Sequence, residues 1–189
     1  MRWLMLYARS RQVPASLAAV LVSTVAAGAL ARGEGPADPR LPVLILATGA
    51  MAASIGLGGQ EPALDRTAAI RWAPRRAGHV LLAGAVVAGV LLGVQALGAS
   101  MASTAFVVRD SAGLMGLAAL GAVLSGGRYA WTLPFAWLSY AFFAQPSTST
   151  PTQVATWLLQ PSGTPAATWT ALALTAVGTS AYAVAGPGR

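Results

Sequence analysis

The feature that most limits how this chain can fold is a series of long apolar runs that charged residues seldom interrupt. Each run is close to the ~20 residues that a helix needs to cross ~30 Å of hydrocarbon. Within a bilayer only helices and closed barrels satisfy every backbone hydrogen bond, and runs of this length favour helices. The sequence therefore predicts an all-α integral membrane protein with six transmembrane helices. They are residues 14–31, 41–58, 79–98, 111–127, 129–145 and 168–186.

The composition excludes a water-soluble globular protein. Hydrophobic residues make up 56% of the 189 residues, charged residues make up 9%, and the mean hydropathy is +0.62. Too few polar side chains remain to cover a soluble surface. The net charge of +7 does not indicate nucleic acid, because the arginines are spread between apolar runs and form no patch with stacking aromatics. We expect one transmembrane domain over residues 1–189. It is expected to contact membrane lipids and to bind no nucleic acid.

The arginines also predict an orientation, since arginine near a span stays on the cytoplasmic face. With six spans and a cytoplasmic N-terminus, nine arginines are inside and three are outside. The sequence thus predicts a multi-pass protein of the bacterial cytoplasmic membrane with both termini cytoplasmic. The inner set is Arg2, Arg9, Arg11, Arg66, Arg71, Arg75, Arg76, Arg128 and Arg189; the outer set is Arg32, Arg40 and Arg109.

Residues 1–12, MRWLMLYARSRQ, form a separate element before the first run. On a helix one side holds Arg2, Met5, Arg9 and Gln12, and aromatic and aliphatic side chains spread over the other. Pro14 separates the segment from the first span. Such a helix lies in the headgroup plane, with its arginines attracted to anionic lipid. A frayed tail is the alternative.

Residues 59–78 form the one long connection on the predicted cytoplasmic side, between the second and third spans. Pro62 suits the first turn of a helix, and Pro74 is expected to end it. Glu61 and Asp65 come first and arginines follow, which matches the helix dipole. The pattern predicts a short helix parallel to the membrane that docks a cytoplasmic partner. The alternative is that the arginines only fix the topology and contact phosphates.

This order of elements resembles the membrane subunits of ABC-2-type ABC transporters. The loop EPALDRTAAIRWAPRRAGH, with its LDRTA and later arginines, is similar to small actinobacterial permeases of that family. The resemblance implies that the loop holds a coupling helix that fits a groove of the ATPase. The contact candidates are then Glu61, Leu64, Asp65, Arg66 and Arg71.

Residues 146–167 separate the fifth and sixth spans on the predicted outer side. They contain a short apolar patch, Val154 to Leu159, between segments rich in Pro, Ser and Thr. Six residues are too few to cross a bilayer, so we expect the patch to enter the outer edge of the membrane and return. ABC-2-type permeases have re-entrant helices at this place, so the resemblance covers nearly the whole chain.

The fifth predicted span holds a concentration of aromatic residues. Those near its ends suit a membrane interface. Phe135, Trp137 and Tyr140 lie deeper, and the resemblance places the fifth span beside the substrate path. These three are candidates to contact an apolar substrate, with a lipid-facing role as the alternative.

Small residues follow a helical spacing in two other spans. Ordinary packing within one subunit is the preferred explanation for both stripes. They are Ala85, Gly89 and Gly93 in the third span and Ala118, Ala122 and Gly126 in the fourth.

The chain is expected to be no enzyme, with no catalytic residue, metal site or cofactor of its own. It has no cysteine and no GxxxxGK[ST] phosphate-binding loop. No Asp, Glu or Arg is expected in the middle of a span, which argues against a proton-driven carrier. The resemblance implies a second permease copy or homologue and cytoplasmic ABC ATPase subunits that hold ATP and Mg.

The sequence thus favours a permease subunit that exports a hydrophobic or amphipathic compound. Two alternatives remain: a non-catalytic membrane scaffold or receptor, and an ATP-independent facilitator.

Overall fold

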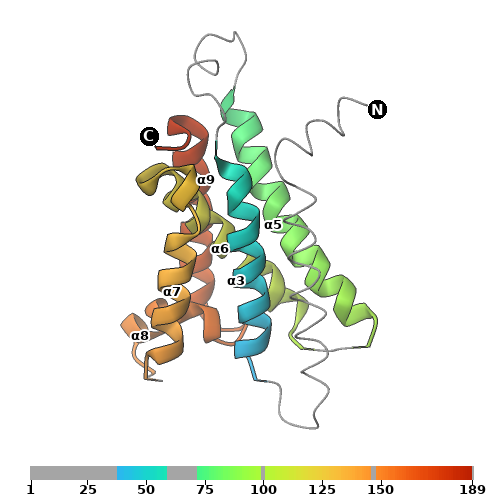
Figure 1. Ribbon diagram of the computed structural model, residues 1–189. Helices are drawn as coiled ribbons and strands as arrows, with labels where there is room; N and C mark the ends of the chain where they lie inside the picture. Colours follow the sequence, from blue (N-terminus) through green and yellow to red (C-terminus); the bar gives the residue numbers. More distant parts are fainter. Residues whose placement is uncertain (1–37, 59–71, 99–100, 146–147, 189) are drawn as a thin grey trace.

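The computed structural model of the protein describes residues 38–58, 72–98, 101–145 and 148–188, all of which form helices or their connections (Figure 1). The longer helices lie side by side and alternate in direction. These described segments contain no strand, which confirms the predicted all-α class. The elements are α3 (Arg40–Ser54), η1 (Ile55–Leu57), α5 (Trp72–Ala96), α6 (Thr104–Ser125), η2 (Gly127–Tyr129), α7 (Thr132–Phe143), α8 (Thr150–Ala155), η3 (Trp157–Leu159) and α9 (Pro165–Ala185).

Three of the helical stretches are long and apolar enough to cross a membrane: Arg40–Leu57, Trp72–Ala96 and Thr104–Ser125. They make the fold compatible with a membrane protein. α7 has 12 residues and is therefore only ~18 Å long, shorter than the hydrocarbon layer. α9 has 21 residues but carries several threonines, which lower its hydropathy.

α6 lies at the centre of the bundle, in contact with α3, α5, α7 and α9. Its side chains Val107, Leu114 and Ala118 are fully enclosed. α5 lies at the edge: 28% of its most apolar stretch is buried, against 72% for α6. A bilayer would cover the apolar residues that α5 exposes, as the sequence pattern predicts.

Glycines bring α6 and α9 into direct backbone contact. A Cβ atom on Gly178 would overlap the carbonyl of Gly116, and one on Gly116 would overlap the carbonyl of Leu174. Ala171, one turn before Leu174, adds another small residue to the same contact. Small side chains of this kind let membrane helices approach closely.

The bundle has two distinct ends. At one, the Arg128 end, Gly58 touches Gly127, and the Tyr182 hydroxyl donates to the Leu57 carbonyl at 2.7 Å. Gly58 and Trp72, the described residues on either side of 59–71, both lie at this end. At the other, the α8 end, the start of α6 bonds to η3 and to the turn between η3 and α9, and α8 lies at the same end (Figure 1).

Two helices begin earlier than the sequence predicts. α5 includes Trp72 to Gly78 and continues through Pro74 to Ala96, so the expectation that Pro74 ends a helix is wrong. α6 begins at Thr104, seven residues before the predicted span. In contrast, the predicted interfacial helix 1–12 and first span 14–31 lie outside the described residues, as do Glu61, Leu64, Asp65, Arg66 and Arg71.

Candidate functional site

An ion pair lies inside the bundle, near the start of α6. Ser103 caps this helix, because its side-chain oxygen accepts a hydrogen bond from the Phe106 N–H at 3.2 Å. The early start places Arg109 and Asp110 in the second turn, where they are 8% and 0% exposed. The expectation that the fourth span begins at residue 111, after Arg109 and Asp110, is therefore wrong. The signal was available, since a serine cap precedes an Arg-Asp doublet that leads into the apolar run.

Arg109 binds four oxygen atoms at once. Its Nε donates to Asp110 Oδ1 at 2.7 Å, and its Nη1 donates to the Pro161 carbonyl at 2.9 Å. Its Nη2 donates to the carbonyls of Gln160 at 2.7 Å and Trp157 at 3.3 Å. The guanidinium carbon also lies 5.0 Å from the centre of the Phe106 ring. All of these interactions lie at the α8 end of the bundle.

The physical reason for this arrangement is the end of η3. The Gln160 carbonyl, directly after η3, accepts from Arg109, and a buried carbonyl without a partner would be costly. The carbonyls of Trp157 and Pro161 also accept from the N–H groups of Gln160 and Thr164, so Arg109 is their second donor. Arginine offers five donors in a planar fork and remains charged, so one side chain can satisfy several carbonyls. Asp110 balances the charge that this requires. Its second oxygen, Oδ2, has no hydrogen-bond partner among the described residues.

Arg109 thereby holds α8 and η3 in the bundle. The indole of Trp157 is 0% exposed and lies against Gly113, where an added Cβ would be 2.5 Å from the ring. Leu158 is also 0% exposed, and the Trp137 Nε1 donates to the Ala155 carbonyl at 2.9 Å. The expected apolar patch is thus divided, with Trp157 and Leu158 inside and Val154 37% exposed.

The three candidates for a substrate path do not share one surface. Phe135 and Tyr140 are 51% and 57% exposed on α7, and Phe135 packs edge-on against Trp131 with ring centres 5.9 Å apart. Trp137 is half-buried and bonds to α8 through Ala155. In the described structure Trp137 is therefore a packing residue, whereas the other two present apolar surface to the surroundings.

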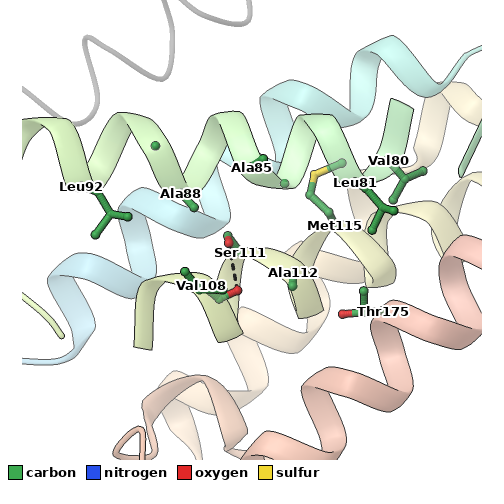
Figure 2. A pocket seen from close by; sticks show the side chains of 12 residues that line it. Val80, Leu81, Ala85, Ala88, Leu92, Val108, Ser111, Ala112, Met115 and Thr175 are labelled. Carbon is green, nitrogen blue, oxygen red and sulfur yellow. Dashed lines mark hydrogen bonds between the residues drawn. The ribbon is translucent and has the colours of Figure 1, made fainter. Parts of the chain in front are cut away.

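An apolar groove runs between α5 and α6, with Thr175 of α9 at its base (Figure 2). Its volume is about 390 Å³. Two polar side chains that line it are already bonded to their own helices: Ser111 donates to the Val108 carbonyl at 3.1 Å and Thr175 to the Ala171 carbonyl at 2.7 Å. The groove therefore offers hydrocarbon surface and no unused donor from these two hydroxyls.

The two predicted small-residue stripes have different surroundings. Ala85 and Gly89 line the groove, and no described atom lies within 4 Å of a Cβ on Gly89 or Gly93. Ala118 and Ala122 are fully buried, as packing within one subunit requires. The closest helix contact lies elsewhere, at Gly116 and Gly178. Sequence reasoning missed this pair because the chain has 21 glycines and spacing alone does not say which face meets a partner.

Arg75 and Arg76 lie at the Arg128 end, in the first turns of α5. Arg75 is exposed, with its guanidinium carbon 5.9 Å from the centre of the Trp72 ring. Arg76 is half-buried beside Gly186, at the end of α9. These positions suit a water-facing end of the bundle and contacts with phosphate.

The described part of the chain contains no group of three or more His, Cys, Asp or Glu residues that could hold a metal ion. The candidate site is therefore the Arg109 centre, namely Arg109, Asp110, Trp157 and the three carbonyls that Arg109 binds. Comparison with known proteins gives no further guide: no family model, no characterised protein and no solved structure matches this chain.

Proposed function

We propose that this chain is the membrane subunit of an ABC-2-type transporter, which exports a hydrophobic or amphipathic compound with ATP hydrolysed by a separate protein. The observation that carries the proposal is the α8–η3 segment, 150–159. It lies between the last two long elements, α7 and α9, with Trp157 buried against α6. This is the place where the resemblance implies a re-entrant element.

The Arg128 end supports the same proposal. The proposed coupling loop, residues 59–78, follows η1 and includes the start of α5, Trp72 to Gly78. Tyr182 ties η1 to α9, Gly58 meets Gly127, and Arg76 of α5 lies beside Gly186 of α9. A force on this loop would therefore reach α3, α5 and α9 together, as ATP-driven closure of two attached ATPase subunits requires.

The chemical class of the exported compound is inferred from the groove between α5 and α6 and from the Arg109–Asp110 pair. The groove between α5 and α6 is apolar, and the charge at the α8 end is paired in Arg109 and Asp110. None of the described residues that line the groove is charged and could compensate a buried charge on a cargo, which favours a hydrophobic or amphipathic compound. The aromatic residues that α7 exposes, Phe135 and Tyr140, are available to a second permease copy or to lipid.

Co-expression with a candidate ATPase tests the proposal. The wild-type chain should co-purify with the ATPase, and vesicles that contain both should move an amphipathic dye in an ATP-dependent way. The double variant Asp65→Arg/Arg66→Glu should lose both properties, because it reverses the charges of the coupling loop. Arg75→Lys is the matched control and should retain both, since it preserves the charge of an exposed residue.

The outcomes separate the alternatives. ATPase binding without transport would indicate a scaffold or receptor. Transport without ATP would indicate a facilitator. If the double variant binds the ATPase and transports as the wild type does, the loop arginines serve topology alone and the coupling role is wrong.

A further inference from the structure

We propose that the α8–η3 segment is a cap over the α8 end of the bundle, that Arg109 is its latch, and that the cap opens as a unit while the long helices stay packed. The inference concerns Thr150 to Pro161 and their contacts with α6. It goes beyond the proposed function, since it holds whether or not the chain is a transporter.

The cap packs against α9, α7 and α3, but few hydrogen bonds join it to these helices and α6. Apart from Arg109, the described side-chain hydrogen bonds that reach its backbone from the long helices come from Trp137 alone. Ser103 and Ser162 add one exposed contact between hydroxyls at 3.3 Å. No residue of α8 is buried. The indole of Trp157 and the side chain of Leu158 supply most of the apolar anchorage.

The cap also holds its own shape. The Thr156 hydroxyl donates to the Thr152 carbonyl at 2.7 Å, and the Gln160 side-chain amide donates to the Thr156 hydroxyl at 2.9 Å. The Thr156 N–H also donates to the Thr152 carbonyl, at 2.8 Å. Because these bonds lie within the segment, they persist when the cap leaves the bundle. Local opening without global unfolding is the expected behaviour of such a unit.

The closed state leaves two buried polar atoms without a described partner. They are the Oδ2 of Asp110, beside the latch, and the indole Nε1 of Trp157, in the cap itself. Burial of an unpaired polar atom opposes the closed state, and opening lets water reach both atoms. Arg109 works in the other direction, since opening would break its bonds to Trp157, Gln160 and Pro161. The balance between open and closed therefore depends on this arginine.

Thiol labelling of the full-length protein in lipid nanodiscs tests the inference, because the natural chain has no cysteine. Leu158→Cys places a reporter in the buried part of the cap, and Ala118→Cys places a matched reporter in the core of α6; both positions are 0% exposed. A water-soluble maleimide measures how often each is exposed. In the otherwise unchanged protein, both reporters should react slowly.

The latch is then removed by Arg109→Leu/Asp110→Leu, which leaves no unpaired charge and therefore preserves the fold. We expect labelling of the cap reporter to accelerate about tenfold or more, because the lost bonds are to a charged donor, whereas the α6 reporter stays slow. Arg109→Lys should give an intermediate rate, since a lysine cannot span the same carbonyls. Asp110→Asn leaves the three carbonyl bonds available, and its amide oxygen can still accept from the Arg109 Nε, so it should label much more slowly than the double variant.

Three results would overturn the inference. Unchanged labelling of the cap reporter in both Arg109 variants would show that Arg109 is no latch. An equal rise at both reporters would show that Arg109 holds the whole bundle. A rise in Asp110→Asn as large as in the double variant would assign the effect to the ion pair. If the double variant does not fold, Arg109→Lys with the same two reporters decides.

Discussion

Gly178 of α9 rests on the carbonyl oxygen of Gly116 in α6, so these two helices meet backbone to backbone. In a membrane no hydrophobic effect drives helices together, because lipid is as apolar as the side chains. Close van der Waals contact and weak Cα–H···O bonds take its place. The pair therefore sets the distance at which the last helix packs on the central one.

A methyl group at this contact should disrupt it. Gly178→Ala would force α6 and α9 apart, and we expect a loss of at least ~1–3 kcal/mol of stability, as for other overpacked cores. Thermal denaturation in detergent, followed by size-exclusion chromatography, measures the loss. Gly89→Ala is the matched control: its added methyl meets open space, so stability should be unchanged or slightly higher. Equal melting of the two variants would contradict the assigned contact.

The contact between Gly113 and Trp157 predicts a compensating pair of substitutions. Gly113→Ala places a methyl against the indole and should expel the ring, so that aqueous iodide quenches Trp157 fluorescence. Trp157→Leu in the same chain should recover the lost thermal stability, because the smaller side chain leaves room for the methyl. The quenching measurement requires replacement of the other five tryptophans. Additive effects of the two substitutions on stability would mean that the residues do not touch.

The ion pair predicts an order of stabilities. Arg109→Leu leaves Asp110 buried without its partner and should cost ~3–5 kcal/mol. Arg109→Leu/Asp110→Leu should be much less destabilised, because replacement of a whole buried pair by apolar residues is often nearly neutral. Thermal melting of the wild type and both variants in the same detergent tests this order. A double variant less stable than the single one would show that Asp110 has another essential partner.

The two ends of the bundle predict opposite labelling in intact cells. Thr150 at the α8 end and Ser125 at the Arg128 end are both exposed. Thr150→Cys should react with a membrane-impermeant maleimide added outside, and Ser125→Cys should react only after the cells are opened. The reverse pattern would invert the predicted orientation, and reaction at both positions would show that the bundle does not cross the membrane.

The helical class and the alternation of the helices could be predicted from the sequence, because runs such as 41–58 and 79–98 are long and free of acidic residues. The start of α6 could not be located by hydropathy. Arg109 and Asp110 lower the apolar average of the turns that contain them, although in the fold their charges neutralise each other. The prediction therefore began the span at Ser111 and assigned Arg109 to a loop.

Other features depend on tertiary contacts that no local pattern contains. The carbonyls of Gln160 and Pro161 attract Arg109 only because α8 and η3 fold back on α6. The break between the fourth and fifth predicted spans is longer than the sequence pattern predicts. Gly126 has a φ of 85° and is followed by the short η2, so α7 starts at Thr132 rather than at residue 129. The proposed roles of residues 59–71 stay predictions.

The hydrogen bond from Tyr182 to Leu57 joins positions 125 residues apart in the chain. During synthesis α3 emerges long before α9. The Tyr182 hydroxyl can therefore donate to the Leu57 carbonyl only after nearly all of the described chain has been made. Gly116 of α6 likewise gains its backbone contact only when α9 has been made. Of the described helices α9 is therefore the last to join the bundle, and a ribosome stalled before Pro165 would hold a chain whose central helix still lacks this neighbour.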